Sequence, residues 1–570
     1  MSQAIAYQDD RTRTYLPPTA LVWQSDSGVS GAQVLLASRL PQAVFSREPC
    51  CVLESGSGLV LDFGRELHGG VALTVNLVHW LDGRKTGPGP VQVRLRLGES
   101  VVEVMRSPNS DHAVHDLAVP VSFLGCHEYG NTGFRFVRID LVEPSCRLEL
   151  RAVHAVSLMR PLERVGAFGC SDERLDRIWD VGARTVELCM QTHLWDGIKR
   201  DRLVWIGDMH PETMVVSNVF GAHPIVPASL DLVRDHTPLG QWMNGISSYS
   251  LWWIIVQHSW YLHHGDLDYL RAQRDYLAGL LEQVFGRIGD DGSEQLDGTR
   301  FLDWPSSPDT TAVHAGLQAL TAMATDRGAR LCEALGEPDL ARRCDEARTR
   351  LARHVPPAGT SKQAGALLAL SGLSDPGEMN KAVLADRPLE GLSTFYGYYA
   401  LEARALAGDA AGCLDVIRRF WGAMLDLGAT TFWEDFSLDW AGDDVVGIDQ
   451  IVSPGKRSIH ADFGAFCYKG LRHSLCHGWA AGPTAWLTRH VLGVRPVEPG
   501  CRHVIVSPQL GDLQWAEGRV PTPHGPVRVR VERKGPAQID TSVECPPGVE
   551  LLTPAKADER SETHAPPAWF

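Results

Sequence analysis

The feature that most constrains the fold is a change in hydrophobic period near residue 171 and again near residue 496. Between these points apolar residues recur at helical spacing, as Leu175, Ile178 and Val181 do. Further segments with this spacing lie near residues 208–220, 227–234, 242–264, 268–288, 309–335, 338–354, 363–372, 376–385, 394–408, 409–427 and 471–492. About a dozen helices with no strand pattern between them are the number needed for two concentric rings of six, an (α/α)6 toroid.

The flanking regions have the period of strands. Residues 58–64, 69–75, 91–98, 134–139 and 148–153 are short runs rich in β-branched residues, separated by Gly, Pro and Asp turns. Their regular spacing predicts an antiparallel N-terminal β-sandwich. Strands return at residues 503–508, 515–520 and 525–531, with a hairpin turn at residues 522–525 and a loose tail over 555–570. We therefore expect a multidomain α + β chain: a sandwich over residues 1–160, a catalytic toroid over 161–495 and a small C-terminal β-domain over 496–570.

Composition limits the partners and the compartment. With 54 basic and 69 acidic residues, the net charge of -15 argues against nucleic acid or an anionic membrane as a partner. The sequence has no run long enough to span a bilayer and no signal peptide at its start. Its 13 cysteines include no CxxC pair, which is typical of a reducing compartment. We expect a cytoplasmic protein.

Residues 194–212 combine side chains that suit neither a core helix nor an ordinary solvated surface. Between residues 195 and 208 the stretch holds three carboxylates, three cations and two tryptophans: Asp196, Asp201, Asp208, Lys199, Arg200, Arg202, Trp195 and Trp205. Gly207 and Pro211 argue against one continuous helix. We predict a loop over residues 195–207, then a helix that Asp208 could cap. This loop is either tied down by salt bridges or carries chemistry.

A second acidic cluster lies at residues 428–436, where Gly428 can end a helix and Glu434 follows Trp433. A glycosidase needs two carboxyl groups flanking the scissile bond, one protonated and one ionised. The two clusters offer such a pair. Tryptophan suits a sugar site because its flat face lies against a pyranose while its N–H bonds a hydroxyl. The alternative is that most of the 17 tryptophans are core residues.

No other chemistry has comparable support. The sequence has no phosphate-binding glycine loop followed by Lys-Ser/Thr and no Gly-x-Ser-x-Gly elbow. His210 with Glu212, and the pair His263 and His264, lack the HExxH spacing of a zinc site. We expect no cofactor and no catalytic metal.

These motifs resemble those of the bacterial α-L-rhamnosidases, glycoside hydrolase family 78. Residues 196–208 align without a gap to the family's Asp-Cys-Pro-x-Arg-Glu-Arg-x-Gly-Trp-Thr-Gly-Asp, and residues 428–434 resemble its Gly-Ala-Thr-Thr-x-Trp-Glu. Residues 303–304 and 62–64 are similar to its Gly-Asp-Trp and Asp-Phe-Gly, and His477 falls at its Asn-His-Tyr histidine. The resemblance spans nearly the whole chain in order. It implies a β-sandwich, an α/α toroid and a C-terminal β-domain.

The resemblance also implies residue roles. By position, Asp201 is the general acid and Glu434 is the base that activates water. The sugar pocket would comprise Asp196, Arg200, Trp205, Asp208, Trp253, Trp304, Trp433 and His477. Because the family inverts configuration, the two carboxyl groups should lie roughly 6.5 to 9.5 Å apart. The implied reaction releases terminal L-rhamnose from small glycosides, and an aromatic pocket suits the C6 methyl of that sugar.

The chain departs from the family pattern in places that bear on the substrate. Asp201 stands where the family usually has Glu, and Gly197 with Ile198 replaces Cys-Pro. Two alternatives therefore stay open. One is a related toroid enzyme acting on another deoxy or uronic sugar, by hydrolysis or elimination. The other is a sugar-binding protein without catalysis. The aglycone, the linkage and the oligomeric state stay open too, with a homodimer as one arrangement to test.

Overall fold

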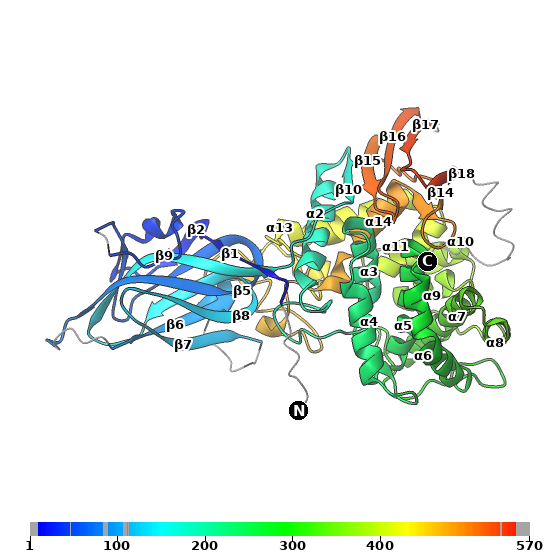
Figure 1. Cartoon of the computed structure of the whole chain (residues 1–570), viewed down its shortest axis with the longest axis horizontal. Coiled ribbons are helices and arrows are strands. Elements are labelled where there is room, and N and C mark those ends of the chain that lie inside the picture. The colour runs from blue at the N-terminus through cyan, green and yellow to red at the C-terminus, as the bar shows by residue number, and fades with distance from the viewer. Residues whose placement is uncertain are drawn as a thin grey trace.

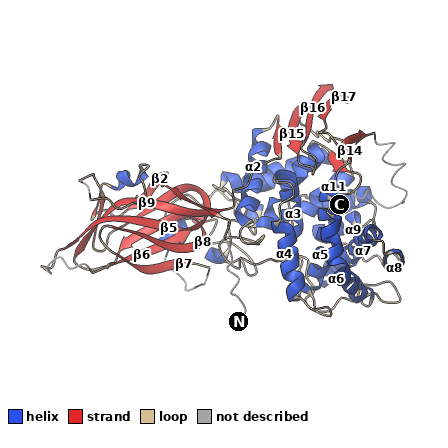
Figure 2. Cartoon of the chain, viewed as in Figure 1, coloured by secondary structure: helices blue, strands red, loops and turns tan. Residues whose placement is uncertain are grey.

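The computed structural model describes residues 9–45, 47–83, 89–106, 111, 113–535 and 538–553. Figure 1 shows a body of strands, coloured blue to cyan, beside a larger body of helices, coloured green to yellow. A smaller group of strands, coloured orange and red, lies against the helices (Figures 1 and 2). The tail over residues 555–570, expected to be loose, lies outside the described residues.

The N-terminal strands form one nine-stranded sheet in which every pairing is antiparallel. Its main path is β3-β4-β9-β5-β8-β6-β7, with β1 on β9 and β2 on β5. The strands are β1 (Thr12–Leu16), β2 (Ala20–Gln24), β3 (Val29–Ser30), β4 (Cys51–Glu54), β5 (Gly58–Trp80), β6 (Val91–Gly98), β7 (His115–Val121), β8 (Gly125–Leu141) and β9 (Cys146–Met159). The 3-10 helix η1 (Ala32–Leu36) and the short helix α1 (Val101–Met105) are inserted between strands.

This sheet differs from two separate layers because β5 is 23 residues long. Its first part pairs with β2 through residues 59–62, and its second part pairs with β9 through residues 69–80. The strand β8 runs beside both parts. Hydrogen bonding is thereby continuous around one apolar core, which includes Leu61, Leu73, Leu95, Val137 and Leu148. The predicted antiparallel pairing is found, within a single folded sheet.

The central region is mainly helical, as the spacing predicts, but its long loop before residue 470 also carries two short paired strands, β11 (Val445–Val446) and β12 (Arg457–Ser458). Counting helices that join end to end as one, residues 161–495 hold twelve helical segments besides isolated 3-10 turns. They are α2 (Glu173–Cys189), α3 (Met209–Val219), α4 (Ile225–His236), α5 (Ser247–His264), α6 (Leu267–Phe285), α7 (Thr310–Leu335), α8 (Pro338–Leu351), α9 (Lys362–Leu370), α10 (Pro376–Met379) with η3 (Asn380–Leu384), α11 (Gly397–Leu406), α12 (Ala410–Val416) with η4 (Ile417–Trp421) and α13 (Gly422–Asp426), and α14 (Gly482–Trp486) with η8 (Leu487–Val491).

Six of these helices form a closed ring of contacts. The helix α3 packs on α5, α5 on α7, α7 on α9, α9 on α11, α11 on α14, and α14 again on α3. Every residue of α3, α9 and α14 is buried, as expected for helices covered on all sides. By contrast, α8 buries only Ala341, Cys344, Ala347 and Leu351, one face of an amphipathic helix. The segments that precede α3, α5, α7 and α14, or begin these helices, meet at one end of the ring.

The C-terminal strands form two small sheets. One has the order β10-β15-β16-β17, and the other has the order β13-β14-β18. The strands are β10 (Ala167–Cys170), β13 (Val494–Pro496), β14 (His503–Val506), β15 (Trp515–Val520), β16 (Val527–Gly535), β17 (Gln538–Glu544) and β18 (Glu550–Leu552). The predicted hairpin between β15 and β16 is present. The strand β10, which precedes all the ring helices in sequence, completes this sheet rather than the helical body.

Two further observations concern the described residues alone. None of their helices combines the length and the hydropathy needed to cross a bilayer. All thirteen cysteines lie within the described residues, and each is a free thiol.

Candidate active site

The first acidic loop runs between α2 and α3 without regular secondary structure, as predicted. Its backbone is fixed where the loop begins. The Trp195 amide donates to the Cys189 carbonyl at 2.9 Å, and the Gly478 amide donates to the Asp196 carbonyl at 2.8 Å. Asp201 and Arg202 have φ values of 52° and 55°, a left-handed conformation that is costly for residues other than glycine. The loop therefore depends on its surroundings to hold this shape.

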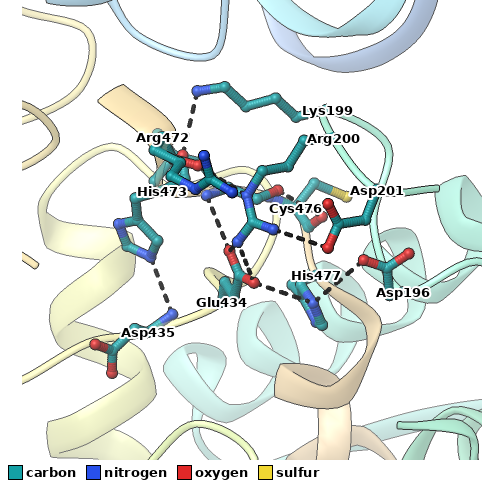
Figure 3. Close-up of polar contacts among 12 residues, drawn as sticks. Asp196, Lys199, Arg200, Asp201, Glu434, Asp435, Arg472, His473, Cys476 and His477 are labelled. Atoms are coloured by element: carbon teal, nitrogen blue, oxygen red, sulfur yellow. Dashed lines mark hydrogen bonds and ion pairs between the residues drawn. The ribbon is translucent and has the colours of Figure 1, made fainter. Parts of the chain in front are cut away.

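The second loop follows α13, where Gly428 has a φ of 92° and turns the chain out of the helix. Glu434 is held through its main chain. Its amide donates to the Ser474 carbonyl at 3.0 Å, and its carbonyl accepts from Trp479 Nε1 at 2.9 Å and Thr394 Oγ1 at 2.6 Å. These contacts leave the Glu434 side chain directed at Arg200 (Figure 3).

The third segment carries His477. The sequence predicts a helix over residues 471–492, but the regular helix begins only at Gly482. Residues 471–481 form loops with the short 3-10 helices η6 (Gly470–Arg472) and η7 (Gly478–Ala481), because the chain here pairs with both acidic loops. The His477 amide donates to the Phe432 carbonyl at 2.9 Å, and Gly197 forms a β-bridge with His477.

Arg200 joins the two proposed catalytic carboxylates. Its Nη2 lies 2.5 Å from both carboxylate oxygens of Glu434, and its Nη1 lies 3.0 Å from Asp201 Oδ2. Its Nε donates to the Arg472 carbonyl at 3.0 Å, which fixes the guanidinium plane. The side chain of Glu434 is 4% exposed and that of Asp201 is 30% exposed. Glu434 therefore lies deep in the site and Asp201 nearer its mouth.

Asp196, Asp208 and Glu434 surround the His477 imidazole (Figure 3 shows two of them). His477 Nε2 lies 3.8 Å from Asp196 Oδ2, 3.8 Å from Asp208 Oδ2 and 3.5 Å from Glu434 Oε1. Asp208 occupies the N-cap position of α3, as predicted, but its side chain makes no cap hydrogen bond; its Oδ1 instead accepts from the Tyr249 hydroxyl at 3.1 Å. Asp196 Oδ1 accepts from the Leu203 amide at 2.8 Å.

Burial sets the protonation of this cluster. It raises the pKa of Glu434 to about 7, against the opposing effect of Arg200. Burial also raises the pKa of Asp196 and the pKa of Asp208 well above the ordinary aspartate value, with Asp208 adding to the effect on Asp196. It lowers the pKa of His477 well below the usual value, so the imidazole is neutral at pH 7. The site can thus both donate and accept hydrogen bonds from sugar hydroxyls.

These groups line one cavity of about 140 Å³. Eight of the ten predicted site residues line it: Asp196, Arg200, Asp201, Trp205, Asp208, Trp304, Glu434 and His477. Trp304 lies at the rim and is 37% exposed. The cavity therefore has a charged floor and an apolar wall.

Two predicted pocket residues are wrong as cavity residues. Trp253 is fully buried within α5, packs against Tyr276 and donates from Nε1 to the Leu230 carbonyl at 3.3 Å. Trp433 is buried against Phe436. Neither side chain lines the cavity. Both tryptophans are core residues, the alternative that the sequence left open.

Four aromatic residues of the cavity were missed by the sequence prediction: Tyr249, Phe301, Tyr468 and Trp479. Phe301 and Trp479 had a signal, since they lie three residues before Trp304 and two after His477. Tyr249 and Tyr468 had none. Asp303, next to Trp304, does not face the cavity; its carboxylate accepts from the hydroxyls of Ser306 and Ser393.

Comparison with known proteins agrees with this architecture. Residues 163–364 match the bacterial α-L-rhamnosidase six-hairpin glycosidase domain, and residues 493–564 match the bacterial α-L-rhamnosidase C-terminal domain. No curated protein sequence matches the chain.

Several solved structures are similar in fold. A family 78 rhamnosidase of Bacillus sp. GL1 is 23% identical with a TM-score of 0.71, over 91% of this chain and 55% of that one. A rhamnosidase from Klebsiella oxytoca with rhamnose bound is 22% identical with a TM-score of 0.67, over 84% of this chain and 96% of that one. An α-L-rhamnosidase of Streptomyces avermitilis complexed with L-rhamnose is 18% identical with a TM-score of 0.67, over 87% of this chain and 48% of that one. This chain thus spans about half the length of the Bacillus and Streptomyces proteins. With both domain models matched in order, residues 163–364 and 493–564 belong to the two corresponding domain families of the bacterial α-L-rhamnosidases, which are glycoside hydrolases.

Proposed function

We propose that this chain is an inverting exo-α-L-rhamnosidase that releases terminal L-rhamnose from small glycosides. The observation that carries the proposal is the meeting of Asp201 and Glu434 on one guanidinium, that of Arg200, at the cavity. Two carboxyl groups on separate loops, held at either side of a sugar-sized space, are what glycoside hydrolysis requires. We also propose that the ring of helices is an (α/α)6 toroid and that the domains divide near residues 160 and 495.

In this proposal Asp201 protonates the departing glycosidic oxygen and Glu434 activates water. The exposure of Asp201 fits the first role, because the leaving group departs through the mouth of the cavity. The depth of Glu434 and its pKa of about 7 fit the second, since a base with that pKa is substantially ionised near neutrality. Asp201 Oδ2 contacts Arg200 Nη1 and Glu434 Oε2 contacts Arg200 Nη2. The distance between these two carboxylate oxygens therefore cannot exceed the sum of the two contact distances and the distance between the two nitrogens.

The lining favours rhamnose among the candidate sugars. Asp196, Asp208 and neutral His477 offer acceptors and a donor for ring hydroxyls. Trp205, Tyr249 and Phe301 give an apolar wall for the C6 methyl group: Trp205 and Tyr249 pack at 6.1 Å, and Tyr249 and Phe301 at 6.3 Å. A uronic sugar is disfavoured, because its carboxylate would enter a site that already holds four carboxyl groups and one engaged arginine.

The size of the cavity supports action on chain ends. About 140 Å³ has room for one monosaccharide residue, with the remainder of the substrate at the rim beside Trp304. The cytoplasmic location and a homodimeric state stay predictions, the latter to be checked by light scattering.

The test is to follow hydrolysis of an aryl α-L-rhamnoside by proton NMR from the first minutes. The proposal expects β-L-rhamnose first, followed by mutarotation to the anomeric mixture. Initial α-L-rhamnose would contradict inversion, and an unsaturated product absorbing in the ultraviolet would indicate elimination instead. Binding of rhamnose without turnover of any glycoside would leave a sugar-binding protein.

A further inference from the structure

We propose that Glu99 and Glu103 of the N-terminal sheet domain are positioning residues for catalysis, acting through Lys199 on the loop that carries Arg200 and Asp201. The inference rests on the proposed function for its activity readout. It concerns residues that lie outside the cavity and outside every sequence motif of the site.

Lys199 is buried among oxygen atoms from two parts of the chain. Its side chain is 1% exposed and points away from the Asp201 carboxylate (Figure 3). The ammonium lies 2.9 Å from Glu103 Oε1 and 3.5 Å from Glu99 Oε2, and it donates to the carbonyls of Leu471 at 2.6 Å and His473 at 3.2 Å. Four oxygens therefore surround it, two from the N-terminal domain and two from the segment before His477.

Glu99 contacts a second segment of the site besides Lys199. Its Oε2 also accepts from the Leu475 amide at 2.7 Å. Leu475 follows Ser474, whose amide donates to Glu434 Oε2 at 3.3 Å, and precedes His477 by two residues. One buried carboxylate thus contacts both the loop of the proposed acid and the segment that holds the proposed base.

Glu99 and Glu103 are themselves held in place by hydrogen bonds around α1. Glu103 lies in α1, whose cap Ser100 accepts from the Glu103 amide, and Glu103 Oε2 accepts from the Glu99 amide at 2.9 Å. The Ser100 hydroxyl lies 2.6 Å from His460 Nδ1, while His460 Nε2 lies 3.0 Å from the His473 carbonyl. The Val101 amide donates to the Ile448 carbonyl at 2.8 Å. The helix α1 is therefore bound to the helical body at several points.

A cation site is a competing interpretation of the same residues. Ligand atoms of Glu99, Glu103 and His460 lie within 4.8 Å of one another. The Lys199 ammonium already contacts both carboxylates, however, and both His460 nitrogens have partners. The lysine supplies the positive charge that a metal would supply.

The anchoring of Lys199 affects the strained part of the first acidic loop. Asp201 and Arg202 keep left-handed backbone angles only if neighbouring contacts impose them. Lys199 is two residues before Asp201 and adjacent to Arg200, so its anchoring fixes where the guanidinium meets Glu434. Loss of that anchor should displace the reacting groups without changing the sugar-binding wall.

The test uses the full chain with Glu99→Gln, Glu103→Gln and the double variant. Glu99 still faces Lys199 in E103Q, so the lysine keeps a carboxyl partner. A displacement near 1 Å costs about a hundredfold in rate, so we expect kcat to fall roughly 10- to 100-fold with KM changed less than about threefold. Hydrogen exchange measured by mass spectrometry should become faster in peptides covering residues 195–207 and 470–478, and stay unchanged in α7.

The matched control is Glu54→Gln, which breaks the pair of Glu54 with Arg147 between β4 and β9 of the same sheet. This variant should keep kcat and the exchange of residues 195–207 at the parent values. Glu103→Asp, which retains the charge on a shorter side chain, replaces E103Q should the latter not fold, with the same expected loss of kcat.

Unchanged kcat in folded E99Q and E103Q, a loss confined to KM, or unchanged exchange in both peptides would overturn the positioning role. An inactive parent protein would instead contradict the proposed function, and the exchange result would still decide whether Glu99 and Glu103 hold the loop.

Discussion

A single nitrogen of Arg200, Nη2, contacts both carboxylate oxygens of Glu434 at 2.5 Å, while the other terminal nitrogen contacts Asp201. The arginine therefore links the proposed acid and base and stabilises the ionised form of Glu434. Burial works in the opposite direction on Glu434, and the balance leaves its pKa at about 7.

Replacing Glu434 by Gln should remove turnover and preserve the fold. The amide cannot accept the proton of the attacking water, so kcat should fall at least roughly a thousandfold. Steady-state rates on an aryl α-L-rhamnoside check this, with circular dichroism for the fold. The neighbouring Asp435→Asn is the control, because Asp435 accepts from the Phe436 amide and does not line the cavity. An active E434Q would rule out the base assignment.

Replacing Asp201 by Asn should give a loss that depends on the leaving group. A general acid is needed most when the departing oxygen is basic, so an alkyl rhamnoside should lose roughly a hundredfold or more in kcat/KM. A dinitrophenyl rhamnoside, whose phenolate leaves unaided, should lose far less. Equal losses for both substrates would show that Asp201 is not the acid.

Arg200→Gln should move the acidic limb of the pH profile to higher pH. The parent kcat/KM should fall as pH drops through about 7, where the proposed base takes up a proton. Arg200 lowers the pKa of Glu434, so its removal should raise that pKa and shift the limb upward by roughly 1 to 3 units.

The control for this shift is Arg202→Gln on the same loop. Arg202 donates to the Asn131 carbonyl rather than to either carboxylate, so its removal should leave the limb in place. A downward shift in the Arg200 variant, or an equal shift in both variants, would contradict this account.

The sequence predicts the charged site residues of the first acidic loop well. It predicts poorly which aromatic side chains on a helix, or next to a site residue, point into the cavity. Asp196, Asp201 and Asp208 lie in a stretch without the apolar periodicity of a core helix or strand. Their clustering can therefore be recognised from the sequence alone. Trp433 adjoins Glu434 in sequence and Trp253 lies one helical turn after Tyr249, yet neither tryptophan reaches the cavity. Only the packing of α5 and of the loop after α13 decides which aromatic residue reaches the cavity.

The same limit applies to the fold. Helical spacing identifies the ring helices, yet it extends a helix back to residue 471, where the chain instead pairs with both acidic loops. It also cannot reveal that β10 joins a sheet more than 300 residues away in sequence. Contacts between distant segments, such as that of Lys199 with Glu103, leave no local signal at all.

Trp304→Ala should weaken binding of the aglycone and spare the sugar. Trp304 lies at the rim and stacks with Phe466 at 6.2 Å, and both side chains are more than a third exposed. Loss of such a stacking surface should raise KM for an aryl rhamnoside by roughly tenfold. The inhibition constant of free L-rhamnose should change little.

Trp253→Ala is the informative counterpart, because Trp253 is a core residue. Its removal should lower the free energy of unfolding by about 3 to 5 kcal/mol without a selective effect on KM. A KM effect in the Trp253 variant, or none in the Trp304 variant, would reverse the assignment of rim and core.

Glu212→Gln should make the protein less sensitive to alkaline pH. Glu212 lies in the first turn of α3, fully buried, and among the described residues neither of its carboxylate oxygens has a hydrogen-bond partner. It fits there because residue 478 is glycine: a Cβ at that position would lie 1.7 Å from Glu212 Oε1. Burial, together with Asp208 and Asp196, raises the pKa of Glu212 well above its ordinary value.

The direction in which stability changes with pH follows from the difference between the folded and unfolded pKa of Glu212. A carboxyl group whose pKa is raised by folding contributes stability below its unfolded pKa, and that contribution is lost as pH rises toward and through the folded pKa. The parent protein therefore loses stability at this position with rising pH, whereas the glutamine variant does not. The Tm difference, variant minus parent, should become more positive by roughly 2 °C or more between pH 5 and pH 9. Glu390→Gln, at an exposed position, should show a constant difference, and a constant or falling difference for E212Q would mean that Glu212 is not held as the neutral acid.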